Sequence, residues 1–123
     1  MSYGYTGRIL HVNLTTSELT VEEPEEKFYR TYMGGSAMGM HYVLKETPVG
    51  VEPLSPGNVH ALCTGVVTGT PISGQSRLTS VAKSPLTGCI GDAQGGGFFP
   101  AEMKFSGFDA VIKIGRASCR ERV

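Results

Sequence analysis

Alternating apolar and polar residues near the start of the chain predict a β-hairpin over residues 7–22. Leucine and valine alternate with histidine and asparagine in its first half, and the alternation resumes over 18–22. This period of two is typical of a strand with one buried side. The Thr-Thr-Ser sequence at 15–17 is typical of a turn. We expect His11 to be a solvated strand residue, since no second histidine lies near it in the sequence.

Helical spacing replaces this alternation after Pro24. A proline followed by two glutamates is typical of a helix start, because proline presets the first turn and carboxylates face the positive end of the helix dipole. The following stripe predicts a face packed in the core: Phe28, Tyr29, Tyr32 and Met33. Gly34-Gly35 should stop this helix.

A second helix is predicted after the glycine pair, with Ser36 as its N-terminal cap. Its expected apolar face consists of Ala37, Met40, Val43 and Leu44. The helix should end near Thr47-Pro48. A turn-rich segment with three prolines and two glycines follows over 48–58.

The stretch from Thr64 to Lys104 combines short strands with glycine-rich loops. An apolar run at 59–64 predicts a buried strand that leads into it, and further strands are expected at about 76–83 and 88–93. Three glycines at 95–97 then open a short helix, in which we expect Phe98 and Phe99 to be core residues, as we do Tyr5. A last strand is expected at 109–113. The pattern predicts an α+β fold with mixed β-sheets and short helices.

The same stretch contains the candidate chemistry. Eight of the 17 glycines lie between Gly65 and Gly97, and Arg77, Lys83 and Lys104 supply positive charge. Glycines that open a helix leave free N–H groups at a positive dipole end, which suits an anion such as phosphate. The alternative interpretation is a small β-domain with tight turns, in which both lysines and Arg77 are solvated surface residues.

Composition narrows the function classes. At 123 residues the chain is at most one domain, and 11 basic against 11 acidic residues do not favour nucleic acid or an anionic membrane as a partner. No apolar run approaches the roughly 18 residues needed to span a bilayer, and the N-terminus does not resemble a signal peptide, so we expect a cytoplasmic protein. Cys63 and Cys89 are interpreted as buried, inert thiols, because no Cys-x-x-Cys motif is present.

The C-terminal residues 114–123 have an unusual sequence. Ile-Gly-Arg-Ala-Ser-Cys-Arg-Glu-Arg-Val matches the in-frame translation of a common sequencing adaptor. We therefore divide the chain into a domain over 1–113 and a non-native tail over 114–123. The alternative is a genuine flexible tail, and the codons of the source DNA decide between them.

Several segments together resemble the N-terminal domain of the aldehyde ferredoxin oxidoreductase family, the tungsten-pterin enzymes. They run in family order and at family-like spacing between about residues 4 and 113. The matching segments are 7–16, Gly-Gly at 34–35, 53–58, Thr-Gly-Val-Val-Thr-Gly-Thr at 64–70, Lys-Ser-Pro-Leu-Thr-Gly at 83–88, Gly-Gly-Phe-Phe at 96–99, and 102–109.

The resemblance implies an incomplete cofactor-binding domain of an oxidoreductase. Family members oxidise aldehydes to carboxylic acids, or perform related low-potential reactions, at a tungsten or molybdenum held by two pyranopterins. A [4Fe-4S] cluster passes the electrons to ferredoxin, and magnesium bridges the pterin phosphates. The implied partners are therefore ferredoxin, the remaining C-terminal domains of the same chain and a possible second copy in a homodimer, with no nucleic acid and no membrane.

The resemblance also implies the site residues. Arg77 would lie beside the pterin and the cluster, and the loop of Ala93, Gln94, Gly95, Gly96 and Gly97 would hold the phosphates and magnesium. Gln94, the implied metal ligand, stands where better-known members have asparagine, so it could bind through its main-chain carbonyl or its side chain.

Other features of the sequence qualify this resemblance. Ser36 replaces an arginine that is common in the family, which suggests a divergent branch. The cluster-binding cysteines, a second pterin motif and the substrate-site residues would lie in later domains, so these 123 residues alone should be catalytically inert. Two alternatives are a free-standing pterin- or phosphate-binding module and, more weakly, a structural dimer module.

Overall fold

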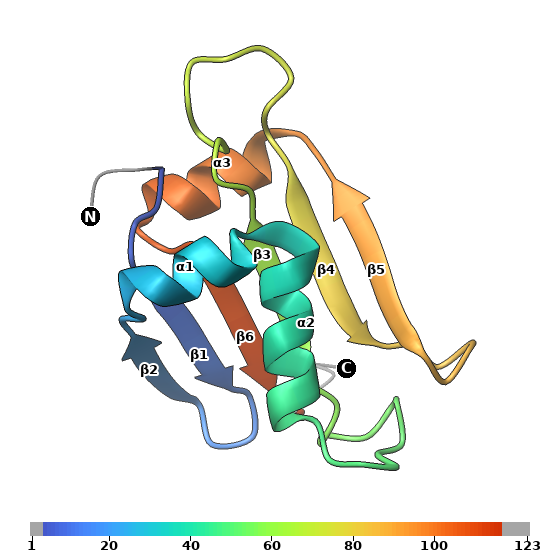
Figure 1. The fold of residues 1–123 in the computed structure, drawn as a ribbon. Helices are drawn as coiled ribbons and strands as arrows, with labels where there is room; N and C mark the ends of the chain where they lie inside the picture. Colours follow the sequence, from blue (N-terminus) through green and yellow to red (C-terminus); the bar gives the residue numbers. More distant parts are fainter. Residues whose placement is uncertain (1–3, 117–123) are drawn as a thin grey trace, which may run out of the picture.

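The computed structural model describes residues 4–116 and shows an α+β fold, as the sequence predicted (Figure 1). The helices and strands are β1 (Ile9–Asn13), β2 (Glu18–Glu22), α1 (Glu26–Tyr32), α2 (Gly35–Glu46), β3 (His60–Thr64), β4 (Leu78–Lys83), β5 (Ile90–Gly95), α3 (Phe98–Phe105) and β6 (Ala110–Ile114). Within the described part, no helix is long and apolar enough to cross a membrane.

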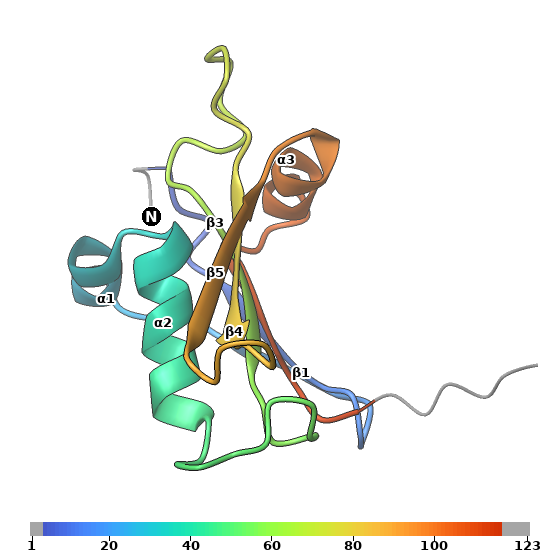
Figure 2. The ribbon, with the colours of Figure 1, turned by 90° about the vertical axis from the view of Figure 1, so that its right-hand side faces the viewer.

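The strands form one mixed sheet in the order β2-β1-β6-β3-β4-β5. Strands β1 and β6 are parallel, although they lie at opposite ends of the sequence, and the other neighbours are antiparallel. Helices α1 and α2 lie on one face, whereas α3 lies on the other, near one end (Figure 2). The parallel pair therefore holds the first strand against the last.

The core lies between the sheet and the first two helices. Its buried residues are Ile9, Tyr29, Met38, Tyr42, Val43, Val59, Ala61, Cys63, Val81, Ala110 and Ile112, and Tyr5 packs against this core. Gly39 lets α2 approach the sheet closely, because a Cβ at this position would lie 2.6 Å from Cγ2 of Val81. The close packing of helix on sheet depends on this missing side chain.

The predicted apolar face of α2 was partly wrong. The helix buries Met38, Gly39, Tyr42 and Val43, whereas Leu44 is 70% exposed. The close approach at Gly39 decides which face of the helix packs on the sheet, and the number of apolar side chains on each face does not. Ser36 is not a cap either, because the N-cap residue is Gly34 and no side chain caps the helix.

Five other expectations about individual side chains were also wrong, beginning with Met33, which was expected in the core but is 62% exposed. Phe98 is 90% exposed and Phe99 is also exposed, since α3 packs through its other side. Cys89 is exposed, next to β5. His11 is half-buried, and its Nε2 lies 2.7 Å from Oε2 of Glu22.

Two strands near the glycine-rich loops differ from the predicted ranges: β4 begins two residues later, and both ends of β5 lie two residues later. Strands β4 and β5 cover 78–83 and 90–95, because the residues just before β4 make loop contacts instead of strand pairs. Ile114, assigned above to the tail, is the last residue of β6, and its carbonyl accepts the N–H of Leu14. Residues 117–123 lie outside the described part, so the non-native tail stays a prediction.

A buried ion pair connects both ends of the chain. Lys104 and Asp109 are 8% and 2% exposed, and Nζ of Lys104 lies 3.7 Å from Oδ1 of Asp109. The carboxylate accepts the N–H groups of Thr6 and Gly7 at 2.8–3.0 Å. Burial lowers the pKa of Lys104, whereas the charge of Asp109 opposes that shift. The expectation that Lys104 is solvated was therefore wrong.

Lys83 also departs from its predicted solvated position. It is half-buried, and its Nζ donates to the carbonyl of Val51 at 2.6 Å. The ammonium group of Lys83 is therefore bonded to a backbone carbonyl of the fold.

Replacing Asp109 by asparagine should strongly destabilise the fold. Asp109→Asn keeps the shape but leaves the Lys104 ammonium without a counter-charge, so the free energy of unfolding should fall by about 3 kcal/mol. Urea denaturation followed by circular dichroism measures this change. The control is Glu102→Gln, an exposed residue of α3. Equal stability of the two variants would contradict the importance of the buried pair.

His60 should contribute to the pH dependence of stability. Burial, and secondly the charge of Lys113, lower its pKa below the ordinary value of 6.5. The unfolded chain then binds the proton more readily, so this contribution is complete above about pH 6.5 and is lost as the pH falls below it. In urea titrations between about pH 8 and pH 5, the free energy of unfolding of His60→Gln should fall less steeply with decreasing pH than that of the wild type. An unchanged slope would show that His60 does not contribute.

Candidate functional site

Three segments far apart in the sequence meet at one end of the sheet. Loop 65–77 rises there between β3 and β4, and β5 ends where α3 begins (Figure 1). Helix α2 also begins there, since a Cβ on Gly35 would lie 3.3 Å from Oγ1 of Thr79 in β4. This region, called the site end of the sheet, contains most of the residues that the sequence singled out.

Arg77 folds against the glycine backbone that follows β5. Its Nη1 donates to the carbonyl of Ser76 at 3.1 Å. A Cβ on Gly96 would lie 2.6 Å from that nitrogen and 3.2 Å from the Ser76 carbonyl oxygen. Only a residue without a side chain leaves the guanidinium this position. Arg77 is exposed, so its remaining N–H groups face solvent.

Ser76 joins this arginine to the start of α3. Its hydroxyl donates to the carbonyl of Gly97 at 2.5 Å. Gly97 is the N-cap residue of α3, with φ of 92°, a conformation that favours glycine. The serine therefore holds the helix start next to Arg77.

The start of α3 presents uncapped backbone amides. No side chain caps the helix, and its first turn contains no acidic residue. Gly95, Gly96 and Gly97 are all exposed. The N–H groups at a helix start and the positive end of the helix dipole together favour an anion.

An open hollow of about 450 Å³ lies beside these groups. It is lined by Gly74, Gln75, Ser76, Arg77, Gly97, Phe98 and Ala101. The exposed Phe98 contributes an apolar surface next to the arginine. A ligand with an anionic group and an apolar or planar body matches this combination.

The structure brings together some of the predicted site residues more closely than others. Arg77, Gly96 and Gly97 form one contact group, and Gly95 directly precedes them. Gln94 and Ala93 lie one and two residues before Gly95 in β5, opposite Thr79 and Ser80, and both are exposed. Because side chains alternate along a strand, Gln94 and Ala93 face opposite sides of the sheet.

A metal site would need ligands beyond these protein side chains. Among residues 4–116, no three His, Cys, Asp or Glu residues come close enough together to hold a metal ion. The main-chain and side-chain carbonyls of Gln94 are both oxygen donors of the kind that magnesium prefers. The choice between them stays a prediction.

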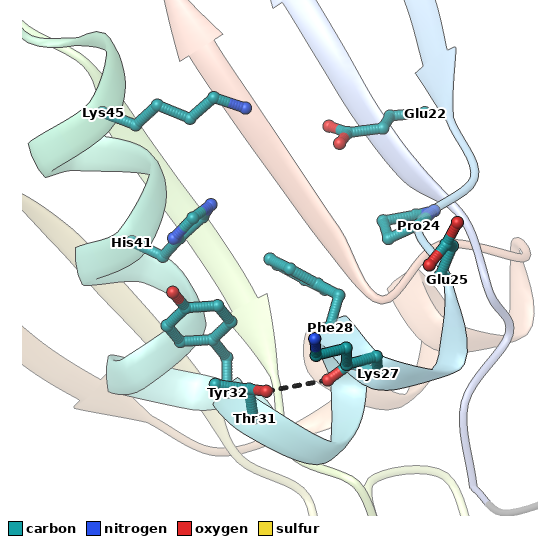
Figure 3. Close-up of a pocket in the computed structure, with 9 residues that line it drawn as sticks. All are labelled: Glu22, Pro24, Glu25, Lys27, Phe28, Thr31, Tyr32, His41 and Lys45. Atoms are coloured by element: carbon teal, nitrogen blue, oxygen red, sulfur yellow. Dashed lines mark hydrogen bonds between the residues drawn. The ribbon is translucent and has the colours of Figure 1, made fainter.

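A second hollow, of about 410 Å³, lies between α2 and the connection from β2 to α1 (Figure 3). The rings of His41, Phe28 and Tyr32 contact one another, and the centroid of His41 lies 5.2 Å from that of Phe28 and 4.4 Å from that of Tyr32. Burial and the charge of Lys45 lower the pKa of His41. Two glutamates and two lysines line the hollow, so their charges balance and do not favour an anion there.

Sequence reasoning missed Ser76 and Thr68, which shape the site end, and it named Lys104 only for its charge and not for its structural contacts. Ser76 and Thr68 bond to backbone groups, and Lys104 donates to the carbonyls of Gly65 and Val66 at 2.8 and 3.0 Å. Small hydroxyl residues within a glycine-rich segment were a signal, although many turns share it. The partners of Lys104 lie 38 and 39 residues away, which no local pattern reveals.

Comparisons with known proteins give a consistent result. The family described as "Aldehyde ferredoxin oxidoreductase, N-terminal domain" matches residues 9–121. The tungsten-containing aldehyde ferredoxin oxidoreductases of Pyrococcus furiosus and Thermococcus kodakarensis are 42% and 40% identical over 115 residues. These matches cover 94% of this chain but only 19% of each relative. The chain thus spans about a fifth of the length of these relatives.

More distant relatives bear other names. The "Aliphatic sulfonate oxidoreductase, WOR-like subunit" of Pyrococcus furiosus is 28% identical over 118 residues, covering 94% of this chain and 19% of that protein. A solved structure, the active site complex BamBC of benzoyl coenzyme A reductase with 1,5 dienoyl-CoA, has a TM-score of 0.91 and 30% identity. That match covers 96% of this chain and 18% of the other. The fold and the sequence matches agree that this chain belongs to the aldehyde ferredoxin oxidoreductase family, as part of its N-terminal domain.

Proposed function

We propose that the chain is the cofactor-binding N-terminal part of a tungsten or molybdenum bis-pyranopterin oxidoreductase. The observation that carries this proposal is the exposed guanidinium of Arg77 against Gly96, beside the uncapped start of α3. Relatives named as tungsten-containing enzymes support the cofactor class. The site end of the sheet would receive the phosphate end of this cofactor.

The residues fit such a group. A phosphate can accept paired hydrogen bonds from a guanidinium, and amides at a helix start provide further donors. The missing Cβ of Gly96 leaves room for close approach of the backbone. Phe98 adds apolar area beside the arginine, which suits a planar ring system.

Magnesium would bind between the phosphates and the end of β5. Magnesium often combines one or two protein ligands with phosphate oxygens and water. An oxygen of Gln94 is our candidate protein ligand, and no trio of acidic side chains is required for this arrangement.

The parent protein would oxidise aldehydes to carboxylic acids with ferredoxin as the electron acceptor. When bound, the metal centre supplies the two-electron oxidation. This chain holds the cofactor, whereas the ligands of a [4Fe-4S] cluster and the substrate-site residues belong to the rest of the parent, so the chain alone is inert. We base the aldehyde substrate on the 40–42% identical relatives. A cytoplasmic location and a homodimer belong to the same proposal.

A free-standing phosphate- or pterin-binding module is the alternative. The same Arg77 and α3 geometry would serve it, without redox chemistry. The two functions differ in the polypeptide that accompanies this chain, and not in the anion site.

Arg77→Ala should weaken binding of inorganic pyrophosphate to this chain. The variant removes a charged donor, so affinity at low salt should fall about tenfold or more. Isothermal titration calorimetry measures this loss. Arg30→Ala is the matched control, because it removes the same charge from the exposed surface of α1. Equal affinities of the two variants, or no binding by the wild type, would contradict the proposed site.

The source gene distinguishes the oxidoreductase from the free-standing module. Sequencing source DNA across the codons for residues 114–123 should show an open frame that continues into a cysteine-bearing cluster motif. Codons unlike the adaptor, followed directly by a stop codon, would overturn the oxidoreductase proposal and leave the binding module.

A further inference from the structure

We propose that Thr68 is a positioning residue for Arg77, a role that rests on the proposed anion-binding function of the site end. Thr68 lies inside loop 65–77 and is 2% exposed. It therefore does not touch a ligand in the hollow. Its hydroxyl instead contacts the backbone at both ends of the loop.

The hydroxyl of Thr68 closes the neck of the loop. It accepts the N–H of Gly65 at 3.1 Å and donates to the carbonyl of Arg77 at 3.0 Å, with the carbonyl of Gln75 at 3.4 Å. Residue 65 enters the loop, and residues 75 and 77 leave it. The buried hydroxyl thus holds the two ends of the loop together, beside a backbone contact from the N–H of Gly65 to the carbonyl of Arg77 at 3.4 Å. Removing the hydroxyl is costly because it leaves buried polar groups without a partner.

These contacts determine the position of the arginine. The carbonyls of Gln75 and Arg77 lie on either side of Ser76, so anchoring them orients the Ser76 segment. Ser76 then contacts Gly97 through its hydroxyl and the Arg77 guanidinium through its carbonyl. Thr68 is therefore linked to both halves of the proposed anion site through its hydrogen bonds to the Gln75 and Arg77 carbonyls, the backbone of Ser76 and the hydrogen bonds of Ser76.

The rest of the loop is built to keep this neck rigid. Gln75 bridges the loop, since its Oε1 accepts the N–H of Gly69 and its Nε2 donates to the carbonyl of Thr70. Lys104 bonds the loop entrance to α3. These hydrogen bonds fix both sides of the loop. Thr68 therefore favours ligand binding by holding Arg77 in its orientation before the ligand arrives.

The test compares three hydroxyl variants in binding inorganic pyrophosphate. Thr68→Val keeps the shape and removes the hydroxyl, so affinity should fall roughly fivefold through lost preorganisation. Thr68→Ser keeps the hydroxyl and should stay within about twofold of the wild type. Thr70→Val is the control, because the hydroxyl of Thr70 bonds only to the carbonyl of Val67 in the same loop.

A double-mutant cycle separates positioning from general damage to the fold. If Thr68 acts through Arg77, Thr68→Val should cause no further loss of affinity in an Arg77→Ala background. Thermal unfolding confirms that each variant is folded. Should Thr68→Val not fold, Ser76→Ala removes the next hydroxyl in the series at an exposed position, and the same non-additivity with Arg77→Ala is expected.

The outcomes separate this proposal from the proposed function. An Arg77→Ala loss together with unchanged affinity in Thr68→Val overturns the role of Thr68 and leaves the anion site standing. Additive losses in the double variant also overturn it. If Arg77→Ala itself has no effect, the proposed anion site fails first.

Discussion

The buried pair of Lys104 and Asp109 is the interaction on which the arrangement of the site depends. The carboxylate holds the N-terminal segment through Thr6 and Gly7, and the ammonium holds the entrance of loop 65–77. Such a pair is costly to desolvate and must be nearly completely satisfied. The pair and its partners come from three distant parts of the chain, so the pair is satisfied only when all three are in place.

The position of the proposed anion site is a consequence of this assembly. The parallel β1–β6 pair places the first and last strands side by side within the sheet, and α3 lies on the opposite face from α1 and α2. Loop 65–77 and the start of α3 consequently meet at one end of the sheet. Arg77 and the glycine backbone would supply the binding groups of the proposed site, whereas buried hydroxyl and ammonium groups hold the local geometry.

The misassigned side chains have a common physical cause. Phe98 and Phe99 are apolar but exposed, and Lys104 is charged but buried. Local hydrophobicity ranks a residue by its own side chain, yet burial depends on what the rest of the fold places above it. On α2 the deciding contact is between Gly39 and Val81, a pair separated by loops and strands. The start of α3 after Gly96 and Gly97 was easier to predict, because a local glycine pattern defines it.

The sequence by itself determined the order of strands and helices, the α+β class and the glycine-rich segment with Arg77 as the candidate anion site. Local periodicity and turn chemistry carry that information because they act over a few residues. Only the tertiary structure decided that Lys104 is buried, that Thr68 closes the loop and that Ser76 joins Arg77 to α3. Those features require contacts between residues far apart in the chain, and their energies exist only after the sheet has formed.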